Sequence, residues 1–118
     1  MTDARPVCMI TGVGEGIGGH AAKRFAKSGY RIAMLARSVE RLERLEKELD
    51  GSKGYECDVS DLDSLVKICK KIKNEMGAPQ VLIHNAVKGN FETLLNGESE
   101  WLEENFRTNT TSLVYIAK

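Results

Sequence analysis

The stretch ITGVGEGIGG, residues 10–19, places five glycines within eight positions, directly after a short apolar run. In an α/β protein, such a turn between the first strand and the first helix leaves main-chain N–H groups free to bind a phosphate. Gly12 suits the tight turn, Gly16 lets a pyrophosphate approach the main chain, and Gly18 lets the helix lie close to the strand. A flexible surface loop is the alternative, and the position directly after an apolar strand argues against it.

Short apolar runs bounded by turn residues predict four strands, at residues 7–11, 31–36, 54–58 and 81–85. Three of these runs are largely apolar, as in strands buried within a parallel sheet, whereas residues 54–58 alternate in polarity as an edge strand does. Helical patterns separate the strands, so we expect βαβ units with right-handed crossovers. The sequence therefore predicts the α/β class.

The helices predicted between these strands begin and end at recognisable residues. The first runs from Ile17 to a stop at Gly29, Ser60 and Asp63 form a capping box for the third, and Ser99 caps the last. The apolar faces carry Ile17, Ala21 and Phe25 in the first helix, Leu42, Leu45 and Leu49 in the second, Leu62, Leu65, Val66, Cys69, Ile72 and Met76 in the third, and Leu102, Phe106 and Leu113 in the last.

Length, charge and cysteine content narrow the class of protein. The 118 residues suffice for one domain and the net charge is zero, so no basic surface favours nucleic acid as a partner. Cys8, Cys57 and Cys69 form no C-x-x-C pair and lie in apolar runs, which indicates reduced thiols in a cytoplasmic protein and no metal site. Residues 1–6 do not resemble a secretion signal, and no apolar stretch approaches the roughly 20 residues of a membrane span.

Other nucleotide-binding motifs match the glycine stretch less well. Gly14, Gly16 and Gly19 fit G-x-G-x-x-G but begin too far from the end of the strand. Residues 14–21, GEGIGGHA, lack the lysine and the hydroxyl of a P-loop, which excludes kinase or GTPase chemistry. The segment GVGEG, residues 12–16, resembles the G-x-G-x-G of methyltransferases that bind S-adenosylmethionine, but the second strand ends without the acid that holds the ribose. Such a methyltransferase is the alternative from another class of enzyme.

The motif Thr11-Gly12-x-x-x-Gly16-Ile17-Gly18 resembles the T-G-x-x-x-G-I-G cofactor motif of the short-chain dehydrogenase/reductase family. The resemblance extends over nearly the whole chain, because three further motifs follow in the family's order. It implies a Rossmann-type doubly wound parallel sheet with strand order 3-2-1-4 and two helices on each face. It also implies an oxidoreductase that transfers hydride between a nicotinamide dinucleotide and a small carbonyl or alcohol substrate, in a parent protein that forms a homo-oligomer.

The three further motifs carry the rest of the resemblance. Asp58-Val59 is similar to the family's adenine-contacting pair, residues 84–87 (HNAV) resemble its N-N-A-G, and Asn109 resembles the catalytic asparagine of the next long helix. His84 replaces the first asparagine of that motif, and we interpret it as a packed structural residue. The residues predicted to bind the cofactor are Thr11, Gly12, Gly14, Glu15, Gly16, Ile17, Gly18, Arg37, Ser38, Asp58, Val59, Asn85, Ala86 and Val87.

The choice of dinucleotide depends on the end of the second strand. An acid there would bind both ribose hydroxyls and disfavour a 2′-phosphate, and Arg37 stands in its place. The planar Arg37 guanidinium and the Ser38 hydroxyl suit a phosphate, which favours NADP(H) over NAD(H). Glu15 opposes this, because members of the family that use NADP often carry a basic residue there; the carboxylate would repel the phosphate or pair with Arg37.

The family's catalytic Y-x-x-x-K motif does not occur in this chain. Tyr30 and Tyr55 are not followed four residues later by lysine, and the position four beyond Tyr115 lies past the last residue. The resemblance therefore implies one NAD(P)-binding domain over residues 1–118, truncated before the catalytic serine and the tyrosine–lysine segment and inactive alone. A non-catalytic nucleotide-binding short product is the other interpretation. In the loop before the last helix, Lys88 and Phe91 are candidate substrate contacts, although ordinary loop residues would look the same.

Overall fold

The computed structural model describes residues 3–89 and 93–118, so that Phe91 lies outside the described residues. One parallel sheet contains β1 (Val7–Thr11), β2 (Arg31–Ala36), β3 (Lys53–Glu56) and β4 (Val81–His84). Its strand order is β3-β2-β1-β4, with Met9 of β1 opposite Ala33 of β2 and Leu82 of β4. This confirms the predicted α/β class and the Rossmann-type order 3-2-1-4.

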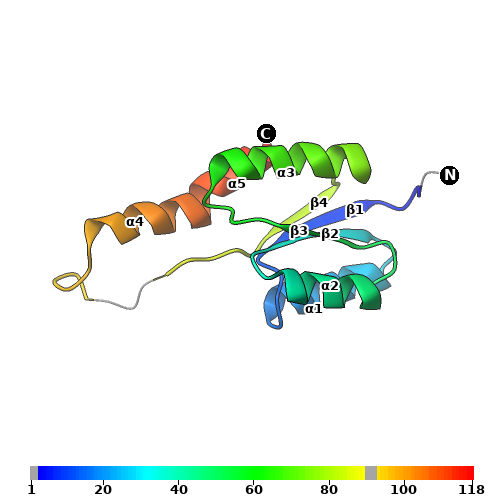
Figure 1. Ribbon diagram of the computed structural model, residues 1–118, viewed down its shortest axis with the longest axis horizontal. Helices are drawn as coiled ribbons and strands as arrows, with labels where there is room; N and C mark the ends of the chain where they lie inside the picture. The colour runs from blue at the N-terminus through cyan, green and yellow to red at the C-terminus, as the bar shows by residue number, and fades with distance from the viewer. Residues whose placement is uncertain (1–2, 90–92) are drawn as a thin grey trace.

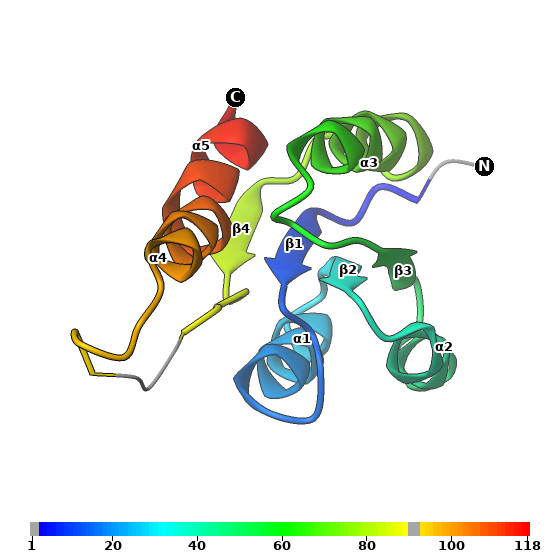
Figure 2. The same cartoon turned by 60° about the vertical axis from the view of Figure 1, so that its left-hand side comes forward.

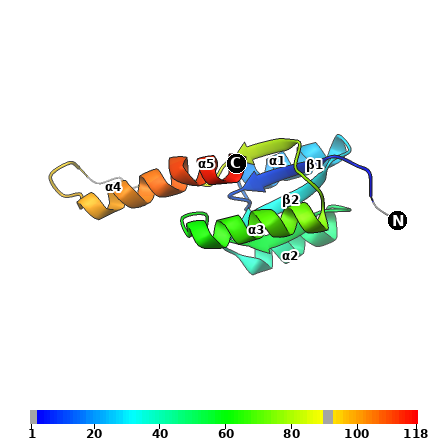
Figure 3. The same ribbon diagram turned by 90° about the horizontal axis from the view of Figure 1, so that it is seen from above.

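Helices cover both faces of the sheet. The helical segments are α1 (Ile17–Lys27), α2 (Val39–Glu48), α3 (Leu62–Glu75), α4 (Ser99–Phe106), the π-helical turn η1 (Arg107–Thr111) and α5 (Ser112–Ala117). Figures 1 and 2 show α1 and α2 on one face and α3 with α5 on the other, while α4 projects beyond the sheet. Seen from above, α4, η1 and α5 follow one another along a nearly common axis (Figure 3). No helix in the described residues is long and apolar enough to span a membrane.

The two faces of the sheet form separate hydrophobic cores because side chains alternate along each strand. Met9 and Leu35 face α3, where Leu65 and Ile72 are fully buried. Cys8, Ile10, Ile32 and Met34 face the opposite way and pack with residues of α1 and α2 that include Ala22, Leu42 and Leu45. Burial of each large side chain contributes about 1.5–3 kcal/mol, so these faces determine which residues of each strand point inward.

Local interactions move some boundaries away from the prediction. The predicted capping box of Ser60 and Asp63 does not form. The Ser60 hydroxyl donates to Asp58 (2.7 Å), and Asp61 caps α3 by accepting from the Ser64 N–H. Ser99 is the first residue of α4 and not its cap, and no side chain caps that helix.

Two further expectations also differ from the observed elements. The edge strand β3 runs over Lys53–Glu56, so it begins one residue earlier and ends two residues earlier than the predicted residues 54–58. The apolar face predicted for α1 includes Ile17, but this side chain is exposed, whereas Gly18, Gly19 and Ala22 are the buried residues of the helix. The first turn of α1 therefore packs through its glycines against the carbonyl oxygens of Gly12 and Gly14 in the preceding turn, and its isoleucine faces outward.

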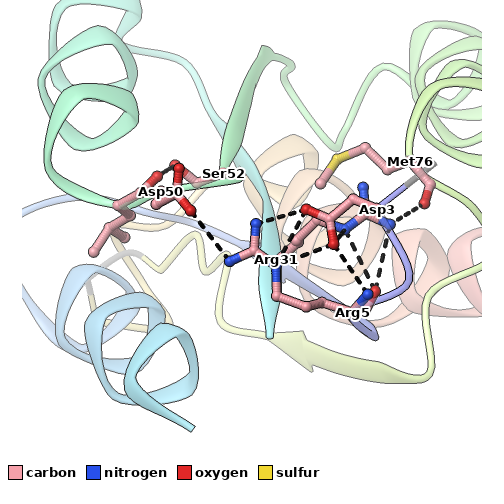
Figure 4. A network of polar contacts seen from close by, with 7 residues as sticks. Asp3, Arg5, Arg31, Asp50, Ser52 and Met76 are labelled. Atoms are coloured by element: carbon pink, nitrogen blue, oxygen red, sulfur yellow. Dashed lines mark hydrogen bonds and ion pairs between the residues drawn. The ribbon is translucent and has the colours of Figure 1, made fainter. Parts of the chain in front are cut away.

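A polar network joins the N-terminal segment to β2 and α3 (Figure 4). Arg31, whose side chain is only 11% exposed, donates to the carbonyl oxygen of Met76 (2.6 Å) at the end of α3 and lies 3.7 Å from the Asp3 carboxylate. Asp3 also accepts from the main-chain and side-chain nitrogens of Arg5. Arg5 in turn lies 3.4 Å from Asp50, after α2. The network therefore ties three elements together at the amino ends of the strands.

We expect this network to make the fold sensitive to acid. Hydrogen bonds from the Arg5 side chain and main chain lower the pKa of Asp3 from 3.8 to about 2. Because the folded pKa lies below the unfolded one, the stabilisation is complete above about pH 4 and is lost as the pH falls toward 2. Urea unfolding between pH 2 and 7 should show a smaller loss of stability at low pH in Asp3→Asn than in wild type. The exposed Glu43→Gln variant is the control, and equal pH dependence in all three proteins would contradict the expectation.

Candidate functional site

A cavity of about 840 Å³ opens where all four strands end. Its walls come from the segments that follow each strand, which is where open α/β sheets bind ligands. The residues that line it are Gly12, Val13, Gly14 and Glu15 after β1; Leu35, Ala36, Arg37, Ser38, Glu40, Arg41 and Arg44 from the end of β2 into α2; Cys57, Asp58, Val59 and Ser60 after β3; Ala86, Val87 and Lys88 after β4; and Thr108 in η1.

The glycine turn is packed tightly on one side and open on the other. Gly12 has a φ of +69°, and a Cβ there would lie 2.7 Å from the main-chain nitrogen of Ala86. A Cβ on Gly18 would overlap the carbonyl oxygen of Gly12, and one on Gly19 would overlap that of Gly14. Gly16, in contrast, has no atom within 4 Å of the Cβ position. The main chain at Gly16 is therefore uncovered, as the binding of a dinucleotide pyrophosphate requires.

The Thr11 hydroxyl fastens the end of β1 to the segment after β4. Its oxygen accepts hydrogen bonds from the main-chain nitrogens of Asn85 (3.0 Å) and Ala86 (3.1 Å), and the side chain is fully buried. The Asn85 side chain returns a hydrogen bond to the carbonyl oxygen of Gly12 (3.1 Å). Thr11 and Asn85 therefore act on the shape of the turn and not on the cavity surface.

His84 is a packed residue whose tautomer follows from its partners. The Thr11 hydroxyl already accepts two N–H groups, so its one hydrogen is donated to Nδ1 of His84 (2.9 Å). Nε2 therefore carries the ring proton and donates to the carbonyl oxygen of Thr108 (3.2 Å), to which the Ser112 hydroxyl also donates (2.5 Å). The ring thus connects β1 and β4 to η1, in agreement with the structural role expected for this histidine.

Asn109 lies in η1 and holds the loop that follows β4. Its Oδ1 accepts from the main-chain nitrogen of Lys88 (2.8 Å), and its Nδ2 donates to the carbonyl oxygen of the same residue (2.9 Å). The Lys88 ammonium lies 2.5 Å from the Glu104 carboxylate in α4. The described contacts of Asn109 are thus positioning contacts to the main chain, and the Lys88 ammonium is directed toward α4.

The wall formed by α2 is rich in arginine. Ser38 caps this helix by accepting from the Arg41 N–H (3.4 Å), as a helix-start residue should. The Arg41 guanidinium lies 3.1 Å from the position of a Cβ on Gly14, so it rests against the glycine turn. Glu15 pairs with Arg44, at 3.5 Å, and the alternative pairing with Arg37 does not form. Among the described residues, no ion pair involves Arg37.

The wall after β3 carries a fixed carboxylate. Hydrogen bonds from the Ser60 hydroxyl and main-chain nitrogen to Asp58 are the main cause of its lowered pKa, and the positive charges of Arg37 and Lys88 act in the same direction. The adjacent Cys57 is buried, which raises the pKa of its thiol to about 11. This wall therefore offers a charged hydrogen-bond acceptor beside an unreactive thiol. Residues 3–89 and 93–118 contain no cluster of three or more acidic, histidine or cysteine side chains suited to a metal ion.

The cavity brings together nine of the residues predicted to bind the cofactor: Gly12, Gly14, Glu15, Arg37, Ser38, Asp58, Val59, Ala86 and Val87. Outside its lining lie Thr11 and Gly18, which are buried, Gly16 and Ile17, which are exposed, and Asn85 and Asn109, which are half-buried. Sequence reasoning missed Arg41 and Arg44. Arg41 and Arg44 follow Ser38 by three and six residues on a helix that begins at the cavity, and this spacing was the available signal, because residues three apart are neighbours on the surface of a helix.

Comparison with known proteins places this architecture in a family. The model of the short chain dehydrogenase family matches residues 6–118. A putative ketoacyl reductase of the granaticin polyketide synthase from Streptomyces violaceoruber is 34% identical, over 99% of this chain and 44% of its own length. The chain thus spans less than half of that relative.

Solved structures agree with the sequence match. The alcohol dehydrogenase from Thermococcus sibiricus, complexed with 5-hydroxy-NADP, is 32% identical with a TM-score of 0.87, over 94% of this chain and 49% of that one. L-sorbose reductase from Gluconobacter frateurii, complexed with NADPH and L-sorbose, is 26% identical with a TM-score of 0.90, over 98% and 46%. With the family match and the glycine turn at the carboxyl ends of the strands, these similarities establish that the chain belongs to the short-chain dehydrogenase/reductase family.

Proposed function

We propose that this chain binds NADP(H), and that the whole protein is an oxidoreductase acting on a small carbonyl or alcohol substrate. The observation that carries the proposal is the uncovered main chain at Gly16, beside a cavity lined by residues that follow all four strands. The cofactor, when bound, supplies or accepts the hydride. Membership of the family argues against the methyltransferase alternative.

The residues of the chain have separate roles in this proposal. Gly12, Gly16 and Gly18 shape the turn and admit the pyrophosphate, while Asp58 holds a hydrogen-bond acceptor at the adenine side of the cavity. Asn109 keeps the main chain of Lys88 in place through two hydrogen bonds. The expected absence of turnover by residues 1–118 alone also remains a proposal, which rests on the lack of a Y-x-x-x-K motif among them.

The preference for NADP(H) rests on charge at the end of β2. Arg37 stands where an acid would bind the ribose hydroxyls, and no ion pair with a described residue neutralises it. Arginine binds phosphate through parallel hydrogen bonds, which favours a cofactor with a 2′-phosphate. Two relatives of known structure, the alcohol dehydrogenase and the sorbose reductase, were solved with NADP-type cofactors, which supports the same choice.

We expect Arg37→Asp to raise the Kd for NADPH by about tenfold or more, because the charge-assisted hydrogen bonds of the arginine are lost and a repulsive charge is added. The Kd for NADH should change much less. Fluorescence titration of each variant with both dinucleotides measures the effect. Arg24→Asp is the matched control, since this arginine lies on α1 and donates to Ser28. An unchanged Kd for NADPH in Arg37→Asp would contradict the proposed cofactor.

We further propose a cytoplasmic location and self-association of the whole protein. Cys8 and Cys57 are buried, free thiols, and burial raises the pKa of each to about 11, which suits a reducing compartment.

The proposed self-association rests on α4. Leu102 and Phe106 of this helix are 55% and 63% exposed and lie one helical turn apart. An exposed apolar surface of this kind supports contact with a second subunit.

A further inference from the structure

Glu15 places a negative charge at the edge of the cavity that we propose for NADP(H). It lies in the glycine turn, directly before Gly16, and lines the same cavity as Arg37. A carboxylate at this edge repels a cofactor that carries a 2′-phosphate more strongly than one that does not. A site for NADP(H) therefore needs a way to neutralise Glu15.

Arg44 is placed to supply the neutralising charge. Its Nη1 lies 3.5 Å from Oε1 of Glu15, and both side chains line the cavity. The two side chains are 62% and 72% exposed, so the pair contributes little to folding stability. The pair can still affect the binding of a charged ligand, because the ligand would bind within a Debye length of both charges and salt would not fully screen them.

The balance of charge along this wall of the cavity depends on Arg44. Within the cavity lining, α2 and the segment before it contribute Arg37, Arg41 and Arg44 together with Glu40, and the glycine turn contributes Glu15. With Arg44 present, the cations outnumber the carboxylates by one. Without it, the two charges are equal in number and Glu15 has lost its partner.

We propose that Arg44 is a specificity-determining residue that acts through Glu15. By pairing with this carboxylate it removes the repulsion that a 2′-phosphate would otherwise meet, and the glycine turn can keep an acid in an NADP(H) site. The inference rests on the proposed cofactor and adds a residue outside the motifs of the family. It does not require Arg44 to touch the phosphate.

A double-mutant cycle tests the role of Arg44. The Kd values for NADPH and NADH are measured by fluorescence titration for wild type, Arg44→Ala, Glu15→Ala and the double variant, at low and high salt. Arg44→Ala should raise the Kd for NADPH by about threefold to tenfold at low salt, with a smaller effect at high salt and little change for NADH. In the double variant, removal of Glu15 should restore binding to about the level of Glu15→Ala.

Lys23→Ala is the matched control. Lys23 of α1 pairs with Glu48 of α2 at 3.6 Å, so this ion pair also involves α2, and neither residue lines the cavity. This variant should bind both dinucleotides as wild type does. A loss in Lys23→Ala equal to that in Arg44→Ala would overturn the proposal, because it would reflect the packing of α2 against α1 and not the charge of Glu15.

The remaining outcomes separate this inference from the proposed function. If Arg44→Ala weakens NADPH binding equally with and without Glu15, Arg44 acts independently of the carboxylate and the proposal is overturned. If wild type prefers NADPH and Arg44→Ala keeps the full preference, the proposal is overturned while the proposed cofactor stands. If wild type shows no preference for NADPH over NADH, the proposed cofactor itself is wrong.

Discussion

Replacing Gly18 with alanine is expected to abolish dinucleotide binding and to lower the free energy of unfolding by about 3 kcal/mol. The added Cβ would overlap the carbonyl oxygen of Gly12 and would lie 3.0 Å from Nδ2 of Asn85. A main-chain oxygen cannot rotate away as a flexible side chain can, so the turn and the start of α1 must separate. Urea unfolding gives the stability change, and titration with NADPH gives the loss of binding.

Gly16→Ala is the control that separates binding from folding. No atom lies within 4 Å of its Cβ position, so alanine meets no neighbour there and should lower the free energy of unfolding much less than Gly18→Ala does. We nevertheless expect weaker NADPH binding, because the methyl group would cover the main chain that the pyrophosphate approaches. Unchanged binding in Gly16→Ala would show that the cofactor does not lie against this turn. Unchanged stability in Gly18→Ala would contradict the close contact with Gly12.

Thr11→Val is expected to destabilise the fold by about 3 kcal/mol, because it leaves buried polar groups without their partner. The hydroxyl accepts from the main-chain nitrogens of Asn85 and Ala86 and donates to His84. Valine has nearly the same shape, so little packing is lost and the change reports the hydrogen bonds. Unfolding in urea measures the effect, and NADPH titration should also show weaker binding, since the segment after β4 lines the cavity.

Thr11→Ser is the matched control for this prediction. Serine keeps the hydroxyl and loses one methyl group, so it should be less harmful than valine although it removes buried apolar surface. If Thr11→Ser lost more stability than Thr11→Val, the methyl group would matter more than the hydroxyl. That result would rule out the hydrogen-bonded junction as the main role of Thr11. Amide hydrogen exchange at Asn85 and Ala86 gives a second readout, with faster exchange expected only in Thr11→Val.

The α/β class and most of the site could be predicted from the sequence because both depend on local pattern. The apolar run at residues 7–11 is long enough only for a strand, and the glycines after it have few uses other than a phosphate turn. The register of the strands then brings the segments after β1, β2, β3 and β4 to one edge, as parallel strands must. The nine predicted residues that line the cavity are therefore those adjacent in sequence to a strand end.

The partners of long or polar side chains could not be predicted in the same way. Glu15 has Arg37, Arg41 and Arg44 within reach of its turn, and only the crossing of α1 and α2 over the sheet decides that Arg44 pairs with it. The cap of α3 is a similar case, because the Ser60 hydroxyl donates its hydrogen bond to Asp58 and the N-terminus of the helix is capped by Asp61. Such choices differ by fractions of a kcal/mol, so tertiary geometry determines them and local sequence does not.

By itself, then, the sequence determined where most of the strands and helices form and where glycines leave the main chain uncovered by side chains. These properties follow from the spacing of apolar residues and from the absence of side chains at glycine. Only the tertiary structure decided that His84 joins Thr11 to η1 and that two arginines of α2 lie against the glycine turn. Those contacts connect residues far apart in the chain, and their geometry exists only once the layers have packed.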